Sequence, residues 1–221
     1  EPNAFDGKDK EYANTESHDA TGRFVPSWSR DTSGNLILEP IIGYDEGQLK
    51  EDIQSVISSG VSTVFEPFTY EMGGVNYFIT SIVSPIQVNG KTVGVIGLDL
   101  TLDEMHEFVK EFTLYDSGFA GLITGEGTLV SYNNDEAIGE NYYEVGGVNN
   151  YAKLEQLKED VKNGNLHMMT GYSKALSKDV YRLFVPIQMN GTEQYWSTFV
   201  AAPVDEVMKE ASQVRNAILI V

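Results

Sequence analysis

Two arginines flank a tryptophan near the N-terminus, in the run Gly22-Arg-Phe-Val-Pro-Ser-Trp-Ser-Arg30. The chain contains only four arginines and two tryptophans, so Arg23, Trp28 and Arg30 form an unusual concentration of these types. A guanidinium offers planar donors to a carboxylate, and an indole ring offers a flat wall to an apolar or cationic group. The segment is therefore a candidate for binding a small charged molecule. The alternative is an ordinary edge strand with a surface arginine.

Two further features carry residue types of a binding site. In Glu66-Pro-Phe-Thr-Tyr70 the aromatic residues Phe68 and Tyr70 alternate, so in a strand they lie on one face, although core packing explains them equally. Asp99 follows the apolar run Val93 to Leu98, where a carboxylate must be solvated, paired or facing a ligand, because burying it unpaired is costly. It could also cap the helix that follows. An arginine and this aspartate together could hold a zwitterion.

No arrangement typical of catalysis is present. The sequence has no Gly-x-Ser-x-Gly motif, no phosphate-binding loop and no complete dinucleotide fingerprint. The absence of cysteine excludes thiol catalysis, disulfides and Cys-ligated zinc. His18, His106 and His167 have no partner four residues away that would suggest a metal site on a helix. We therefore expect no enzyme activity, no metal and no cofactor in this chain.

Composition limits the possible partners. The 221 residues include 15 Lys and Arg against 33 Asp and Glu, which gives a formal charge of −18, and 41% are hydrophobic. That apolar content supports a folded core in one large or two small domains. The negative charge argues against nucleic acid, because a phosphate-binding surface needs clustered Lys and Arg. An anionic membrane surface would repel the chain for the same reason.

The residue patterns alternate between helices and strands. Apolar periodicity predicts helices over Asp45 to Ser59, over Tyr151 to Lys162 and from Asp205 onward. Asn89-Gly90 between apolar runs predicts a tight hairpin, because a type I′ turn needs positive φ at both central residues. Thr101-Leu-Asp-Glu104 has the pattern of a capping box that opens another helix.

The same order of elements occurs twice. Val185-Pro-Ile-Gln-Met-Asn-Gly191 repeats Ser84-Pro-Ile-Gln-Val-Asn-Gly90 at an offset of 101 residues. An apolar strand and an acidic helix start follow each copy, Leu102-Asp-Glu-Met105 in the first and Val204-Asp-Glu-Val207 in the second. A repeat of this period indicates duplicated domains rather than solenoid units. The sequence predicts an α+β protein of two tandem units, each an antiparallel sheet flanked by helices.

The run Tyr77 to Met105, which contains the first copy of the repeat, resembles the double Cache (tandem PAS-like) extracellular sensor domain. That family is found in prokaryotic chemoreceptors, sensor histidine kinases and related transmembrane receptors. The run Ser117 to Ser131 is similar to the opening of the family's membrane-proximal module, and Phe199 to Val207 is similar to its end. The similarity covers nearly the whole chain.

The resemblance implies a division of labour along the chain. Residues 1–112 would form a membrane-distal module that binds a small molecule, and residues 113–207 a membrane-proximal module that relays the signal. Residues 208–221 would form a C-terminal helix leading to a transmembrane span, and the apolar run Ala217 to Val221 fits the start of such a span as well as the last turn of a packed helix.

In family members that bind amino acids, an arginine followed closely by Trp-Tyr, an aromatic residue after proline and an aspartate at the end of a strand hold the ligand. The sequence departs from that pattern, because Arg23 and Trp28 are five residues apart and Pro67 is followed by phenylalanine. Asp99 retains the contact expected for an amine. The ligand-binding set that the resemblance implies is Arg23, Trp28, Phe68, Tyr70 and Asp99, and the expected ligand is an amine, amino acid or carboxylate metabolite.

The family also implies what surrounds this chain. Its long N-terminal helix is missing here, so we expect a trimmed periplasmic or extracellular domain of a receptor that is membrane-tethered and homodimeric at full length. The cytoplasmic output would be a histidine kinase or a chemotaxis signalling domain. Two other functions remain open from the residues, a structural or adhesive ectodomain without a ligand and a hydrolase that uses acidic residues.

Overall fold

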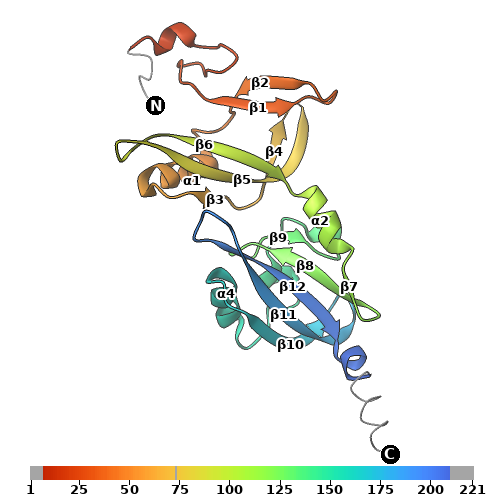
Figure 1. Cartoon of the computed structure of the whole chain (residues 1–221). Helices are drawn as coiled ribbons and strands as arrows, with labels where there is room; N and C mark the ends of the chain where they lie inside the picture. The colour runs from red at the N-terminus through yellow and green to blue at the C-terminus, as the bar shows by residue number, and fades with distance from the viewer. Residues whose placement is uncertain (1–6, 73, 210–221) are drawn as a thin grey trace, which may run out of the picture. The chain divides into compact units, whose positions relative to one another are not determined.

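The computed structural model describes residues 7–72 and 74–209 (Figure 1). The chain separates into two compact units, Glu1–Leu100 and Thr101–Val221, which we call unit 1 and unit 2. Antiparallel sheets with flanking helices form both, which confirms the predicted fold class. The division falls before α2, because α2 packs on strands β8 and β9 of unit 2. The functional boundary expected after residue 112 stays a prediction.

Unit 1 is built around one long strand, β5. Strands β3 and β4 pair with β5, and β6 pairs with it as well, whereas β1 and β2 form a separate antiparallel hairpin. Helix α1 packs on the sheet through Val56, which is buried with Phe65 and Val83. The elements are η1 (Asp9–Tyr12), β1 (Pro26–Arg30), β2 (Leu36–Pro40), α1 (Gly47–Ser59), β3 (Thr63–Val64), β4 (Phe68–Met72), β5 (Val75–Val88) and β6 (Lys91–Thr101).

Two sequence signals in unit 1 are confirmed by the backbone. Asn89 and Gly90 have φ angles of 52° and 76° in the turn between β5 and β6, as a type I′ hairpin requires. Helix α1 ends at Gly60, whose φ of 68° places it in the left-handed region that glycine tolerates best. Residues close together in the sequence therefore fix both the end of α1 and the turn between β5 and β6.

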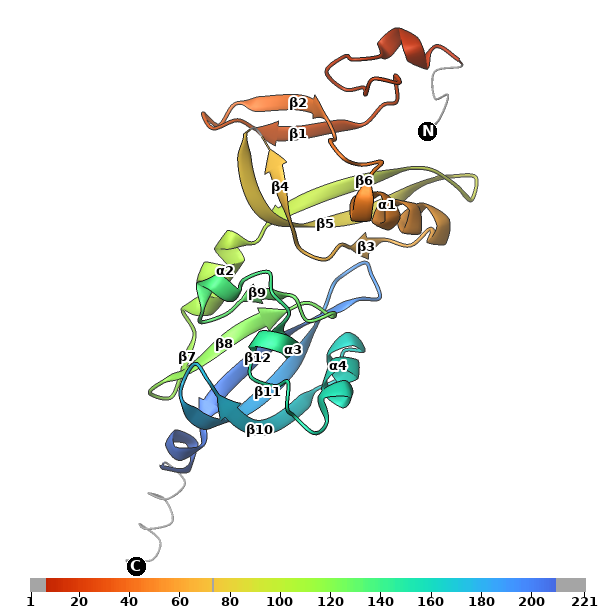
Figure 2. The ribbon, with the colours of Figure 1, turned by 180° about the vertical axis from the view of Figure 1, so that it is seen from behind.

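Unit 2 is a sheet of six strands in the order β10-β11-β12-β8-β7, with β9 also paired to β8. Helices α3 and α4 lie on the face of this sheet seen in Figure 2, over a core in which Tyr142, Phe184 and Phe199 are fully buried. The elements are α2 (Asp103–Lys110), β7 (Thr113–Leu114), β8 (Gly118–Ile123), β9 (Leu129–Ser131), η2 (Asp135–Ala137), α3 (Tyr142–Val145), α4 (Leu154–Lys162), β10 (His167–Ser173), β11 (Lys178–Gln188) and β12 (Tyr195–Pro203).

The internal repeat corresponds to the hairpins β5–β6 and β11–β12. Pro85 and Pro186 lie near the ends of β5 and β11, and the shared Asn-Gly follows each in the turn. The copies are offset by 101 residues before the turn and by 102 after it, since Asp103 of the first corresponds to Asp205 of the second. This correspondence allows the two sheets to be compared position by position.

One local prediction is wrong, and one alternative considered for Asp99 does not hold. Thr101 remains in β6, so the N-cap of α2 is Leu102 and no side chain caps the helix; the predicted capping box does not form. Asp99 likewise lies inside β6 and does not cap α2. Both residues adopt strand rather than helix-cap conformation, because β6 continues to Thr101, two residues past Asp99.

A further helix starts after β12 and is described over residues 204–209. Most of the predicted helix over 208–221, including Ala217 to Val221, lies outside the described residues. Within the part that is described, no helix is both long and apolar enough to cross a membrane.

Candidate functional site

The aromatic pair of β4 lies on one face of the sheet of unit 1. Phe68 is opposite Ile79 of β5, and Tyr70 is opposite Tyr77, so all four positions share one face of the pleat. The Phe68 and Tyr70 ring centroids are 6.1 Å apart and nearly perpendicular, an edge-to-face arrangement. Both side chains are half-buried, which leaves part of each ring accessible.

A carboxylate reaches the same face from β6. The buried Ser81, two residues after Ile79 on β5, donates a hydrogen bond of 2.6 Å from its Oγ to Oδ1 of Asp99. Asp99 itself is exposed. Within residues 7–72 and 74–209 no lysine, arginine or histidine forms an ion pair with it. The serine thus fixes one carboxylate oxygen while the negative charge stays uncompensated.

Tyr70 connects this face to the segment after β2. Its hydroxyl accepts from the Ile42 amide at 3.1 Å and donates to the Ile42 carbonyl at 3.2 Å. Burial raises the pKa of Tyr70, and the carboxylates of Asp99 and Glu39 raise it further. The phenol therefore stays neutral at physiological pH.

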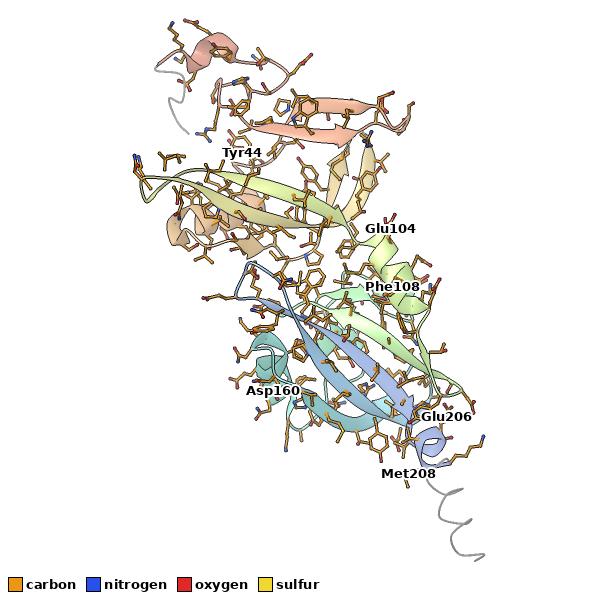
Figure 3. The ribbon with its side chains drawn as sticks, in the orientation of Figure 1. Tyr44, Glu104, Phe108, Asp160, Glu206 and Met208 are labelled. Atoms are coloured by element: carbon orange, nitrogen blue, oxygen red, sulfur yellow. The ribbon has the colours of Figure 1, made fainter. Side chains whose placement is uncertain are left out.

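Arg23 is held by a polar cluster that the sequence did not reveal. Its Nη1 donates to the hydroxyl of Tyr44, which is labelled in Figure 3, at 3.2 Å, and Tyr44 in turn donates to the Asp19 carboxylate. Burial and the bond to Asp19 raise the pKa of Tyr44 to about 12. Burial alone would raise the pKa of Asp19, but hydrogen bonds from Tyr44, Thr21 and the backbone hold it well below the usual range. The guanidinium thus already has a phenol and a nearby carboxylate as partners.

Trp28 lies apart from these contacts. It is 67% exposed on β1, opposite Leu38 of the separate hairpin. Arg30, at the end of the same strand, donates to the Gly34 carbonyl at 2.7 Å and closes the hairpin turn. The structure therefore places Phe68 and Tyr70 of β4 and Asp99 of β6 on one face of the sheet, and it gives Arg23 a local polar role. The assignment of all five candidates to a ligand remains a prediction.

Unit 2 has a hollow of its own, of about 540 Å³, beside α4. Both of its lysines form ion pairs, Lys162 with Glu126 at 2.7 Å and Lys158 with Glu155 at 2.8 Å. We do not assign a ligand to this hollow. Its lining residues are Gly125, Glu126, Asn141, Tyr143, Glu144, Asn149, Leu154, Lys158 and Lys162.

Comparison with known proteins gives this architecture a family. The extracellular domain of a protein named as the histidine kinase mmHK1S-Z3 is 30% identical, with a TM-score of 0.81, over 96% of this chain and 73% of that structure. The methyl-accepting chemotaxis protein TlpQ of Pseudomonas aeruginosa is 28% identical over 152 residues, which cover 62% of this chain and 21% of that protein. No protein-family model matches the chain.

A more distant structure shares the fold alone. The ligand-binding domain of the Pseudomonas aeruginosa chemoreceptor PctB, in complex with L-Gln, is 16% identical, with a TM-score of 0.55, over 88% of this chain and 75% of that domain. The two units with antiparallel sheets and the similarity to the extracellular domain of the histidine kinase point to the same family. The chain belongs to the double Cache family of extracellular sensor domains found in histidine kinases and chemoreceptors. It is a sensor domain and not an enzyme.

Proposed function

We propose that unit 1 binds a small molecule with a cationic nitrogen at Phe68, Tyr70 and Asp99, as the sensing step of a transmembrane receptor. The observation that carries this is the Asp99 carboxylate, which Ser81 orients on the sheet face that also carries the aromatic pair and which no described cation neutralises. A charge-assisted hydrogen bond to the carboxylate and a cation–π contact to the rings would both favour such a nitrogen.

The charges of unit 1 favour an amine over a simple carboxylate. Arg23 is the cation that would receive a ligand carboxylate, but it is occupied by Tyr44 next to the Asp19 carboxylate. The chain as a whole carries −18, which attracts cations and repels anions before contact. An amino acid fits this proposal through its ammonium group, and PctB, named in complex with L-Gln, provides a precedent for such a ligand in this fold.

The similarity to the extracellular domain of a histidine kinase and to a chemotaxis protein supports a place for this chain in the periplasm or outside the cell. We propose that the full-length receptor is tethered to the membrane and homodimeric. Ligand binding would shift unit 1 between two states. The helix that starts at residue 204, directly after β12, would carry the change onward to a kinase or chemotaxis output.

Thermal unfolding of the purified chain with a panel of ligands tests the proposal. The panel holds monoamines, polyamines, amino acids and dicarboxylates, and we expect a saturable rise in unfolding temperature with at least one amine. Asp99→Asn should weaken that ligand by about tenfold or more, since a hydrogen bond to a charged group contributes ~1.5–3 kcal/mol. Phe68→Ala should also weaken it.

Glu71→Gln is the matched control. Glu71 is exposed on β4 next to Tyr70, so its side chain lies on the opposite face of the strand. This variant removes one negative charge from the same strand and should bind the amine as the wild type does. If Asp99→Asn and Phe68→Ala both keep full affinity, the ligand lies elsewhere. If no panel member stabilises the chain, an ectodomain without a ligand becomes the better reading.

A further inference from the structure

Helix α2 has two apolar sides, and the fold of unit 2 uses only one of them. The helix packs on β8 and β9, and Leu102 and Val109 are buried. On the exposed side, Met105, Phe108 and Phe112 follow one another at intervals of three and four residues, which is the spacing of one helix face, and we call these three residues the α2 stripe. Their side chains are 37%, 63% and 52% exposed. The α2 stripe is therefore an apolar surface that the described residues leave accessible.

The two phenylalanines of the α2 stripe pack on each other. Phe112 follows the helix, but its amide donates to the Val109 carbonyl at 3.2 Å, so the chain continues to turn and brings the ring beside Phe108. The two ring centroids are 5.2 Å apart in an edge-to-face arrangement. Single exposed apolar residues are common on protein surfaces, whereas contiguous patches mark interaction sites. Because Phe and Met are also enriched in the cores of interfaces, the α2 stripe is a candidate anchor for a partner.

The α2 stripe is surrounded by negative charge. None of the acidic side chains of this segment forms an ion pair within residues 7–72 and 74–209. The single lysine of the segment, Lys110, is already paired with Asp135 at 2.6 Å. Glu104 and Phe108 are both labelled on this helix in Figure 3. The acidic rim, as we call it, consists of four exposed residues, Asp103, Glu104, Glu107 and Glu111.

The acidic rim decides which occupant the α2 stripe can take. A second copy of the chain, docked through the same surface about a two-fold axis, would bring the four carboxylates of one copy against those of the other. An anionic lipid surface would be repelled by the same charges. A surface whose apolar centre is edged by lysine or arginine would instead bury the two rings and pair its cations with the rim. Charge complementarity therefore favours a basic, apolar protein surface.

We propose that the α2 stripe is the docking surface for a protein partner that presents apolar side chains surrounded by lysine or arginine. The phenylalanine pair would be buried at the centre of the contact, and the acidic rim would steer the approach and fix the orientation of the partner. The surface lies in unit 2 and shares no residue with the amine site of unit 1. Each proposal can therefore fail without the other.

A synthetic helical peptide with leucine along one face and lysine along the other is the probe. Fluorescence anisotropy of the labelled peptide should show saturable binding to the purified chain, and the affinity should fall as salt is added, because the charges of the rim are exposed. The same peptide with glutamate in place of lysine should not bind. Absence of binding by the lysine peptide, or equal binding of both peptides, overturns the proposal.

Truncation of the anchor should have the larger effect on this binding. Phe108→Ala should weaken the lysine peptide about tenfold or more, because a few buried aromatic anchors supply most of the energy of an interface. Phe108 is exposed in the chain alone, so the variant should fold normally. Met168→Ala is the matched control, since it shortens a 67% exposed apolar side chain of β10 that has no part in the α2 stripe, and it should bind as the wild type does.

Neutralising one acid of the rim should have a smaller effect. Glu107→Gln should weaken binding by roughly twofold to fivefold and flatten its salt dependence, as expected for an exposed charge pair. Glu193→Gln removes an equally exposed carboxylate from the turn between β11 and β12 and should leave both unchanged. Equal affinities for the wild type, Phe108→Ala and Glu107→Gln would show that only the net charge of −18 attracts the peptide, which contradicts the proposal.

Light scattering separates this partner from a second copy of the chain. The mass of the chain in solution should be the same for the wild type and for Phe108→Glu. A dimer that Phe108→Glu dissociates would show that a second copy covers the α2 stripe, and that result also overturns the proposal.

Discussion

The two units carry opposite charges within one cross-strand pair of the repeated hairpin. In unit 1, Ser81 of β5 supports the exposed Asp99 carboxylate of β6. In unit 2 the corresponding positions are Arg182 and Ala201, which face each other across β11 and β12. The hairpin recurs with a longer turn in unit 2, because two residues separate β5 from β6 and six separate β11 from β12. The cross-strand pair therefore carries an acid on its second strand in unit 1 and a base on its first strand in unit 2.

The units also differ in whether the sheet face is filled. Gly97 of β6 corresponds to Phe199 of β12, whose ring is fully buried and lies 4.7 Å from the Tyr142 ring and 5.5 Å from the Phe184 ring. A Cβ atom at Gly97 would meet nothing closer than Val83 Cγ2 at 3.6 Å. Unit 2 uses this position for core packing, and unit 1 leaves it open beside Asp99. The face of unit 2 is therefore part of the core, whereas the face of unit 1 leaves room for the proposed amine site.

The largest expected effect is on the filled face. Phe199→Ala should destabilise unit 2 by about 3–5 kcal/mol, because it removes a buried ring from a close-packed aromatic cluster. Chemical denaturation followed by tryptophan fluorescence measures it, since Trp196 lies in the same strand and is buried. Val200→Ala, at the neighbouring half-buried position on the other face, should cost much less. Equal losses for the two variants would show that Phe199 is not the centre of the core.

The next largest expected effect is on amine binding, when the open sheet face of unit 1 receives the residue that fills the face of unit 2. Gly97→Phe gives unit 1 the residue that unit 2 carries, and we expect amine affinity to fall more than tenfold while stability changes by about 1 kcal/mol or less, because the position is exposed. Isothermal titration with the amine found by the ligand panel measures the change. Leu98→Phe, on the opposite face and 61% exposed, is the control and should bind normally. Undiminished binding by Gly97→Phe would place the ligand off this face.

Much of the secondary structure was predictable from the sequence, because the residue patterns that specify turns, helix ends and strand faces are local. Asn89-Gly90 specifies the turn of the central hairpin, Gly60 ends α1, and the alternation of Phe68 and Tyr70 places both rings on one face. These features depend on residues close together in the chain. The repeat extended the same frame to the second unit.

The rest depends on contacts between distant segments. The Ser81 bond to Asp99 spans 18 residues and requires the register across the hairpin, and the Tyr44 link to Arg23 spans 21. Nothing next to Arg182 in the sequence indicates that its guanidinium is buried, since that follows from its contacts with Tyr172 of β10 and with Gly146 at the end of α3. Charge at a site is therefore the property that local patterns predict least well.

The smallest expected effect concerns the two helices that follow the repeated hairpins. Glu104 of α2 and Glu206 occupy equivalent positions (Figure 3). The Glu206 carboxylate accepts from Ser117 Oγ at 2.5 Å, from the amides of Asp116 and Ser117, and from Lys178 Nζ at 3.1 Å. The described residues show no hydrogen bond or ion pair for Glu104, which is exposed. The helix that starts at residue 204 is therefore held by hydrogen bonds from Asp116, Ser117 and Lys178, which we call the Glu206 clamp. The described residues show no equivalent contacts for Glu104 of α2.

Glu206→Gln tests the contribution of the Glu206 clamp through the pH dependence of the unfolding temperature in acid. The Ser117 hydroxyl and the other donors lower the pKa of Glu206 from 4.5 to about 2. A carboxylate whose folded pKa is depressed contributes stability above its unfolded pKa, and that contribution is lost as pH falls through about 4.5 toward 2. The wild type should thus lose unfolding temperature more steeply over this range than Glu206→Gln, which lacks the titrating group. Glu104→Gln should follow the wild type, and a Glu206→Gln profile that does the same would show that the clamp does not hold the helix in solution.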